Sequence, residues 1–373
     1  MKTRQYTTFV PSQADSTRTL RYAIVGTGMM GREHLGNIAH LDDSVVTALI
    51  DPHAESVRLA RPLCDADVSE FEDLKSALES VDFDAVIIAS PNHTHAQIAC
   101  DAIQAGKHVL IEKPMATSVG DCLELERLAI EHPHQVVSVG LEYRFMAPTM
   151  WLLERVRSGE VGDVRLVTIV EHRFPFLDKV GAWNRFNRNT GGTLVEKCCH
   201  FFDLMHQVVQ REPVAVLATS ATRVNHIDES YDGEVPDIVD NAYVIVEFDG
   251  DARGMLELCM FAEGSKDEQK ISVVGDLGKA EVGVPSHECS IGLRESGRSG
   301  VATTIEMLES PYEGLHHGSS YREHVAFRSA ILGQTTVVAS LRDGTRSVAI
   351  GVAAQRSIAE GRRVTLEEVG YGR

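Results

Sequence analysis

The chain has 373 residues, which is long for a single hydrophobic core, so two domains are expected. Its formal net charge of −18 argues against general affinity for nucleic acid or anionic membranes. No apolar run reaches the roughly 20 residues of a membrane-spanning helix. The seven cysteines form no Cys-x-x-Cys pair, which favours reduced thiols and a cytoplasmic location.

Residues 1–20 contain Lys2, Arg4 and Arg18 among threonines and serines, without the hydrophobic core of a secretory signal. We expect a flexible N-terminal tail here. An arm that packs on a neighbouring subunit is the alternative, and an organelle transit peptide is a third reading.

A glycine-rich turn follows the first predicted strand, residues 21–25. Its sequence is Gly26-Thr-Gly28-Met29-Met30-Gly31, and a helical pattern continues from it to about residue 41. Glycines at this spacing let the backbone turn tightly and approach a pyrophosphate, whose charge the helix N-terminus stabilises. Because the motif lies between a strand and a helix, it predicts a dinucleotide site formed by Gly26, Gly28, Met29, Met30 and Gly31.

A second strand, residues 45–50, ends in Asp51, twenty residues beyond the last glycine of the turn. This carboxylate is expected to accept hydrogen bonds from the adenosine ribose and to repel a 2′-phosphate, which favours NAD over NADP. Arg58 lies nearby and keeps NADP as an alternative. Asp51 could instead cap the helix after Pro52.

Strands continue to alternate with helices: a helix near 70–80, a strand at 84–89, a helix to about 105, a strand at 107–111, a helix near 118–131 and a strand at 136–139. This order predicts a parallel, doubly wound sheet. Ser90, Asn92 and His95 follow the strand at 84–89 and should face the cofactor, although Asn92 could equally be a helix cap. Glu112 and Lys113 end the strand at 107–111, which places a cation where a nicotinamide would lie.

In the second half of the chain, the order of predicted strands and helices changes. Predicted strands follow one another with few helices between them, which indicates antiparallel pairing, and Gly275–Gly278 is a plausible hairpin turn. The predicted strands are 164–173, 214–224, 241–248, 252–261 and 270–283, and the predicted helices are 148–157, 194–209, 319–332 and 343–358.

The helix at 194–209 has an apolar side and a narrow polar stripe of Glu196, His200, Asp203 and Gln207. Taken alone, such a stripe is more often a solvated face.

Trp183 and Asn184, which precede the Gly191-Gly192 turn, could line a polyol pocket, and Trp183 could equally be core filler. His93 and His95 have metal-ligand spacing without a third ligand, so no metal site is predicted. The acidic segment 225–240 is a lid, an interface or solvated decoration.

These motifs together resemble the glucose-fructose oxidoreductase / inositol dehydrogenase / rhizopine-catabolism (Gfo/Idh/MocA) family of NAD(P)-dependent oxidoreductases. The matching pieces are the glycine turn, Pro91–Ala96, Gly106–Pro114, Gly140 with Arg144-Phe145, and Gly191–Asp203. The resemblance implies a Rossmann domain at 21–142 and, at 143–373, an α/β domain with a large, mostly antiparallel open sheet. It also implies a cis bond before Pro114 and homodimers or homotetramers that form through the open sheet face.

The resemblance reverses the reading of the polar stripe, because it places the stripe over the nicotinamide. It implies that His200 is the general acid/base, that Glu196 is its partner, and that Lys113 stabilises charge on the substrate oxygen. It also brings Arg144, Trp183 and Asn184 into the substrate pocket. The chain departs from the family pattern at Glu196, usually aspartate, and at Cys198, usually glycine. Lys197 and the Cys198-Cys199 pair add to the unusual features.

We therefore predict an enzyme that transfers a hydride between NAD, or NADP, and a secondary hydroxyl of a sugar, sugar derivative or cyclitol. Three alternatives stay open: a glycoside hydrolase or lyase that oxidises its sugar transiently, a sugar–sugar oxidoreductase, and a non-catalytic sugar or NAD sensor.

Overall fold

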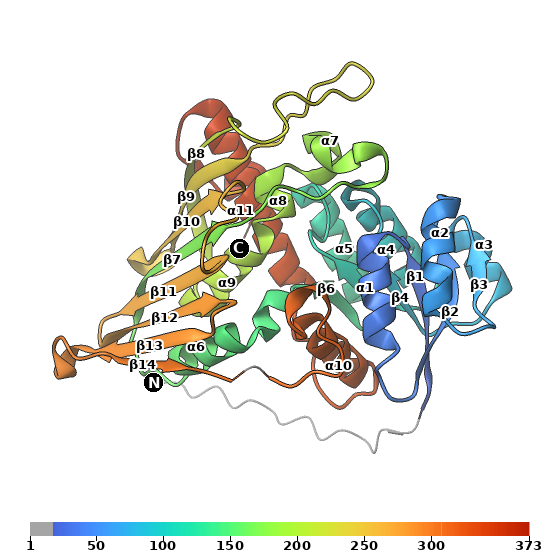
Figure 1. Ribbon diagram of the computed structural model, residues 1–373, viewed down its shortest axis with the longest axis horizontal. Helices are drawn as coiled ribbons and strands as arrows, with labels where there is room; N and C mark the ends of the chain where they lie inside the picture. The colour runs from blue at the N-terminus through green and yellow to red at the C-terminus, as the bar shows by residue number, and fades with distance from the viewer. Residues whose placement is uncertain (1–17, 307, 373) are drawn as a thin grey trace.

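The computed structural model describes residues 18–306 and 308–372, so most of the predicted N-terminal tail lies outside the described residues. The chain forms two sheets side by side, each with its own helices (Figure 1). In the part of the chain that the structure describes, no helix is long and apolar enough to cross a membrane.

The first sheet is the predicted parallel one. Its strand order is β3-β2-β1-β4-β5-β6, and every pair within it is parallel. The strands are β1 (Leu20–Val25), β2 (Ser44–Ile50), β3 (Ser69–Phe71), β4 (Ala85–Ile88), β5 (His108–Glu112) and β6 (Val137–Gly140). The order reverses direction between β1 and β4, which creates the crevice where such sheets bind dinucleotides.

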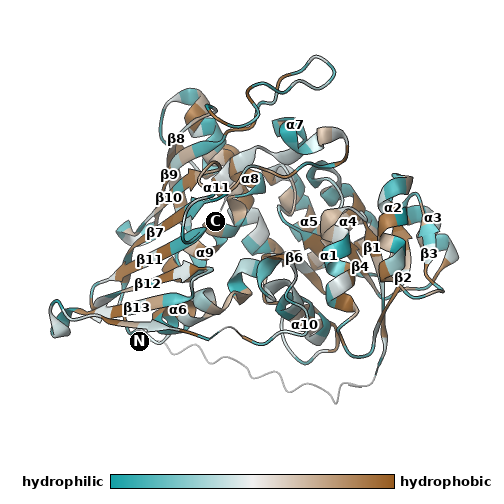
Figure 2. Cartoon of the chain, viewed as in Figure 1, coloured by the Kyte–Doolittle hydropathy of each residue, from teal (hydrophilic) through white to brown (hydrophobic). Residues whose placement is uncertain are grey.

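Helices cover both faces of this sheet, because successive strand residues point to opposite sides. Ala23 and Val25 of β1 pack in a core with α3 (Leu74–Ser80), α4 (His95–Gln104) and α5 (Val119–Glu131). Tyr22 and Ile24 pack in a second core with α1 (Met29–Ile38), α2 (Ala54–Ala60) and α10 (Ser319–Ile331). The inner strands are hydrophobic along their length (Figure 2), as expected for a sheet buried on both sides.

The second sheet has nine strands in the order β14-β13-β12-β11-β7-β10-β9-β8-β15. All of its pairs are antiparallel except β7 with β10. The strands are β7 (Val164–His172), β8 (Pro213–Ala221), β9 (Asn241–Phe248), β10 (Arg253–Cys259), β11 (Gln269–Gly275), β12 (Gly278–Val284), β13 (Glu288–Leu293), β14 (Val301–Thr304) and β15 (Val364–Thr365). The predicted hairpin at Gly275–Gly278 is confirmed by the β11–β12 pairing.

One face of this sheet packs on α6 (Ala147–Arg157), α9 (Cys199–Val209) and α11 (Leu341–Glu360). The long helix α11 also contributes Leu341 and Val348 to a core of the first sheet, so it joins the two halves of the molecule. The segment between β8 and β9, which contains the acidic residues 225–240, projects from the body as an arm (Figure 1).

The structure corrects the prediction of one helix over 194–209. Two helices, α8 (Thr193–Glu196) and α9, are separated by a turn at Lys197 and Cys198. Lys197 directs its ammonium to the Tyr143 hydroxyl at 2.8 Å and to Glu171 at 2.8 Å. The spacing of apolar and polar residues does not reveal such a buried polar contact. It therefore predicted one continuous helix.

Candidate active site

The glycine turn at the end of β1 has the geometry of a phosphate-binding loop. Gly26 has φ +88°, and a Cβ there would lie 2.5 Å from the backbone nitrogen of Ser90. A Cβ on Gly31 would lie 2.0 Å from the Gly26 carbonyl oxygen, whereas one on Gly28 would meet nothing within 4 Å. Gly28 is also the N-cap of α1. Open space in front of a ten-residue helix N-terminus fits the pyrophosphate of a dinucleotide, with half-buried Met29 and Met30 beside it.

Asp51, at the end of β2, is tied to the same turn. Its Oδ2 accepts hydrogen bonds from the Thr27 backbone N–H at 2.8 Å and hydroxyl at 3.1 Å, and its Oδ1 accepts one from His53 N–H at 2.8 Å. The helix that follows is capped by His53 rather than by Asp51. Asp51 is therefore held at the edge of the crevice where the adenosine ribose was predicted to bind.

The loop after β4 also borders the crevice. His95 is buried and bridges two loops, because its ring nitrogens lie 2.9 Å from the Pro114 and Ser90 carbonyl oxygens. Ser90 shares a 2.7 Å hydrogen bond with Thr94. Asn92 is buried, and its side-chain N–H2 has no partner among the described residues. The helix-cap reading of Asn92 is not borne out, since α4 starts at His95 with Thr94 as its N-cap.

Lys113 follows β5, and its bond to Pro114 is cis, as expected. Burial opposes the charged form of this half-buried lysine. Cys199 and the carboxylates of Glu112, Glu142 and Glu196 more than offset that effect, so the pKa of Lys113 is raised above its ordinary value. The site therefore holds a permanent cation at the carboxyl edge of the parallel sheet.

A row of buried, hydrogen-bonded side chains, Glu112, His34 and His324, lies next to Lys113. Glu112 accepts the backbone N–H of Lys113 at 3.0 Å and lies 3.0 Å from His34 Nε2, and His34 Nδ1 lies 2.8 Å from His324 Nε2. Burial favours the neutral acid, but His34 and Lys113 lower the pKa of Glu112 to about 2. Glu112 is therefore a carboxylate that positions Lys113, and His34 and His324 connect it to α1 and α10.

His200, in the first turn of α9, is brought to the same cluster. Its ring stacks on Tyr143 with centroids 4.0 Å apart and an interplanar angle of 6°. Its Nε2 lies 3.5 Å from Glu142 Oε1, and its Nδ1 is buried without a hydrogen-bond partner among the described residues. Burial, and then the charge of Lys113, hold the pKa of His200 well below its ordinary value. The imidazole is neutral and has one nitrogen free to accept a proton.

Glu196 ends α8 and is buried, with Oε2 unpartnered among the described residues. Burial raises its pKa to about 7, opposed by Lys113 and Lys179. Within the described part of the chain, the carboxylate that contacts His200 is Glu142 rather than Glu196. The pairing of Glu196 with His200 thus stays a prediction, and Glu142 is a site residue that our sequence reading missed. Its only signal was its position two residues before Arg144.

Three further residues, Arg144, Asn184 and Trp183, were predicted to bind the substrate. Arg144 is buried and donates to both carboxylate oxygens of Asp203 and to the Val338 carbonyl, and it also lies 3.1 Å from Asp343. Asn184 donates to the Leu177 carbonyl at 2.9 Å and keeps a buried, unpartnered Oδ1. Trp183 is half-buried in the η4 segment (Val180–Arg185), which precedes α7 (Asn187–Thr190). Among the described residues, no group of three or more His, Cys, Asp or Glu is placed to hold a metal ion.

Two family models match the chain. Residues 20–141 match the NAD-binding Rossmann fold of the Gfo/Idh/MocA oxidoreductases, and residues 154–366 match their C-terminal alpha/beta domain. The chain belongs to this family. Its N-terminal sheet is accordingly an NAD-binding Rossmann domain, and the predicted two-domain α/β fold is confirmed.

Individual relatives are similar over most of the chain. A myo-inositol 2-dehydrogenase from Thermotoga maritima is 26% identical over 355 residues, which are 94% of this chain and 99% of the relative. A 2,7-anhydro-N-acetylneuraminate hydratase from Mediterraneibacter gnavus is 27% identical over 273 residues, 71% of this chain and 70% of the relative. Among solved structures, levoglucosan dehydrogenase in complex with NADH and levoglucosan superposes with a TM-score of 0.80 at 21% identity and covers 93% of this chain and 99% of its own.

Proposed function

We propose that this oxidoreductase oxidises a secondary hydroxyl of a sugar, sugar derivative or cyclitol with NAD as the hydride acceptor. The observation that carries the proposal is the convergence of Lys113 and His200, which are 87 residues apart in the sequence, on one buried cluster at the carboxyl edge of the Rossmann sheet. The inositol dehydrogenase among the relatives supports the substrate class.

Each residue has a distinct task in the proposed reaction. The glycine turn, Asp51 and the Ser90–His95 loop would hold NAD, which when bound would supply the hydride acceptor. Lys113 places a fixed positive charge where the hydroxyl oxygen gains alkoxide character. His200 accepts the hydroxyl proton on Nδ1, which has no partner among the described residues, and its depressed pKa keeps the imidazole ring neutral near neutral pH. Glu196, with an unpartnered oxygen, would bind an adjacent substrate hydroxyl.

The test is a screen of NAD and NADP against a panel of sugars and cyclitols, followed by nicotinamide absorbance. We expect Lys113→Ala and His200→Ala to lower kcat by about 10²- to 10⁴-fold. Binding of NAD should be spared, because neither side chain belongs to the glycine turn. The matched controls are Lys75→Ala and His134→Ala, both at exposed positions. Wild-type turnover in either active-site variant would refute the proposed roles.

A hydratase or hydrolase that oxidises its sugar transiently is the second candidate, and the hydratase among the relatives favours keeping it. In that case the purified protein would retain its nicotinamide and convert an anhydro sugar or glycoside without net formation of NADH. Analysis of the products together with nicotinamide absorbance separates the two reactions.

A further inference from the structure

Glu142 lies between two histidines from distant parts of the sequence. Its Oε1 is 3.5 Å from His200 Nε2 and 3.6 Å from Nε2 of His316, which ends the short η7 helix (Gly314–His316). Its second oxygen, Oε2, is buried without a partner among the described residues. A carboxyl group in this position can exchange a proton with either imidazole after a small approach.

Exposure to solvent increases along this row of groups. The side chains of His200 and Glu142 are 2% and 3% exposed, whereas that of His316 is 22% exposed. Tyr143 stacks on His200 and also contacts the His316 ring, with centroids 6.1 Å apart. On its other side, His316 Nδ1 lies 3.3 Å from the Ser320 hydroxyl. The row thus leads from the proposed base to the surface, with both rings packed against one tyrosine.

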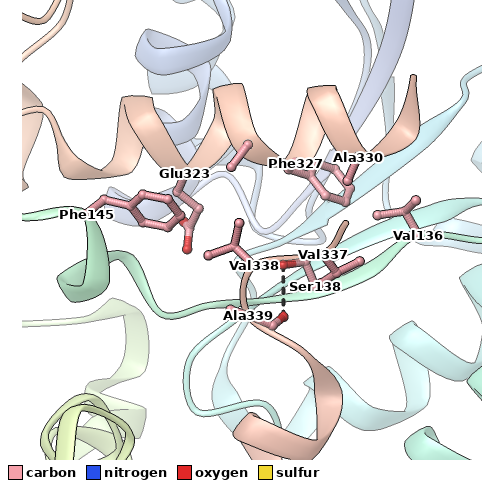
Figure 3. Close-up of a pocket in the computed structure, with 10 residues that line it drawn as sticks. Val136, Ser138, Phe145, Glu323, Phe327, Ala330, Val337, Val338 and Ala339 are labelled. Atoms are coloured by element: carbon pink, nitrogen blue, oxygen red, sulfur yellow. Dashed lines mark hydrogen bonds between the residues drawn. The ribbon is translucent and has the colours of Figure 1, made fainter. Parts of the chain in front are cut away.

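The other charged and titratable groups around Glu142 belong to several elements. They are Glu112 and Lys113 after β5, Tyr143 next to Glu142, Lys197 before α9, Cys199 of α9 and Glu323 of α10, in addition to the two histidines. Glu323 lines a small cavity with Phe145, Val338 and other mostly apolar side chains (Figure 3). Burial, and then Glu142, raise the pKa of Glu323 well above its ordinary value. That carboxyl is neutral and already holds its proton, so it offers no vacant acceptor for a second one.

We propose that Glu142 and His316 carry the substrate proton from His200 to solvent. This inference rests on the proposed function. As the substrate C–H hydride passes to NAD, the O–H proton passes to His200 Nδ1. The Nε2 proton of His200 then passes to the Glu142 carboxylate and leaves through the His316 ring to water. Burial lowers the pKa of His316 to about 3, so this ring passes the proton on without holding it. Exchange with water in the emptied site returns His200 to its Nε2–H form for the next turnover. One alcohol and NAD yield one carbonyl, NADH and one proton.

The protonation state of Glu142 controls this proton transfer. Burial, and then the nearby Glu112 carboxylate, raise the pKa of Glu142 to about 8. Below that pH the protonated carboxyl donates to His200 Nε2, which leaves the proton of a neutral imidazole on Nδ1, the atom needed as the base. Above it the carboxylate accepts from Nε2–H, and Nδ1 is free. Alcohol oxidation should therefore rise with pH through about 8, and carbonyl reduction should fall.

The experiment compares kcat for alcohol oxidation as a function of pH in the wild type, Glu142→Gln and His316→Ala, with His317→Ala as the adjacent histidine control. Glu142→Gln should lose the rise near pH 8 and lower kcat by about tenfold or more, with KM and NAD binding little changed. His316→Ala should lower kcat at low buffer concentration and recover as imidazole is added. An increase in turnover with buffer is not expected of a residue whose role is only structural.

The proposal is overturned if Glu142→Gln keeps the wild-type pH profile, or if His316→Ala has wild-type kcat that does not depend on buffer. A wild type that turns over no substrate contradicts the proposed function instead. Infrared difference spectra of the enzyme between about pH 6 and about pH 10 then still test Glu142. A protonated-carboxyl band that titrates near pH 8 and is absent from Glu142→Gln is expected, and identical spectra overturn the relay.

Discussion

Burial and neighbouring charges set the protonation state of each titratable side chain in the buried site. Lys113 keeps its proton because several carboxylates surround it, whereas His200 loses its proton because it is buried beside that lysine. Glu112 stays ionised through His34, while Glu142 and Glu196, with weaker partners, have raised pKa values. The position at a strand end predicted Lys113 and the family resemblance predicted His200, but the ionisation of three glutamates in one cluster depends on which partner each one meets.

At this scale Asp51 provides a test of cofactor choice. Asp51→Ala should weaken NAD binding by about tenfold, or about 1.4 kcal/mol, since it removes the proposed acceptor for the ribose hydroxyls. The same change should improve NADP binding relative to NAD, because a 2′-phosphate would no longer be repelled. Titrations of both cofactors, with Glu79→Gln at an exposed position on α3 as the control, measure the ratio. An unchanged ratio would mean that Asp51 only holds the turn through Thr27.

Buried ion pairs join several of the elements around the site. Arg144, in the η3 helix (Glu142–Phe145), joins Asp203 of α9 and Asp343 of α11, and so fixes the segment that also carries Glu142 and Tyr143. The sequence resemblance predicted a role for Arg144 in substrate binding. Its donors instead point to a structural role, because Asp203 accepts from two of its nitrogens.

Arg144→Ala should lower the free energy of unfolding by about 3–5 kcal/mol, because it leaves Asp203 buried without a partner. Arg127→Ala is the matched control. It breaks exposed, solvent-screened ion pairs on α5 and should leave the free energy of unfolding almost unchanged. Chemical denaturation measures both variants. If Arg144→Ala keeps wild-type stability and raises KM for the substrate, the original prediction of substrate binding holds.

At the scale of the whole molecule, one face of the nine-stranded sheet is exposed at β8 and β9 among the described residues. Leu217 of β8 pairs with Ile245 of β9, which pairs in turn with Met255 of β10, and Tyr243 lies two residues from Ile245 on the same face. Leu217, Tyr243 and Ile245 are 47%, 53% and 42% exposed. An apolar patch across adjacent strands is typical of a protein–protein interface, so the predicted homodimer or homotetramer has a plausible surface here.

Tyr243→Glu should shift the protein towards monomers, because two copies of the charge would be buried against each other at a symmetric interface. Analytical ultracentrifugation over a range of concentrations measures the shift. Ile130→Glu, which adds the same charge at an exposed position on α5 of the other domain, is the control. If the wild type sediments as a monomer at all concentrations, the prediction of assembly is wrong.

The sequence by itself determined the Rossmann sheet, its glycine turn and the family, because these depend on local signals: strand-length apolar runs, glycine spacing and short motifs. The mostly antiparallel second sheet also followed from the order of its strands, although the parallel β7–β10 pair did not. Only the tertiary structure decided that the helix breaks at Lys197, that Arg144 faces Asp203, and that Glu142 lies between His200 and His316. Those contacts join residues far apart in the chain, and the energies that place them arise from burial and charge, which no local pattern records.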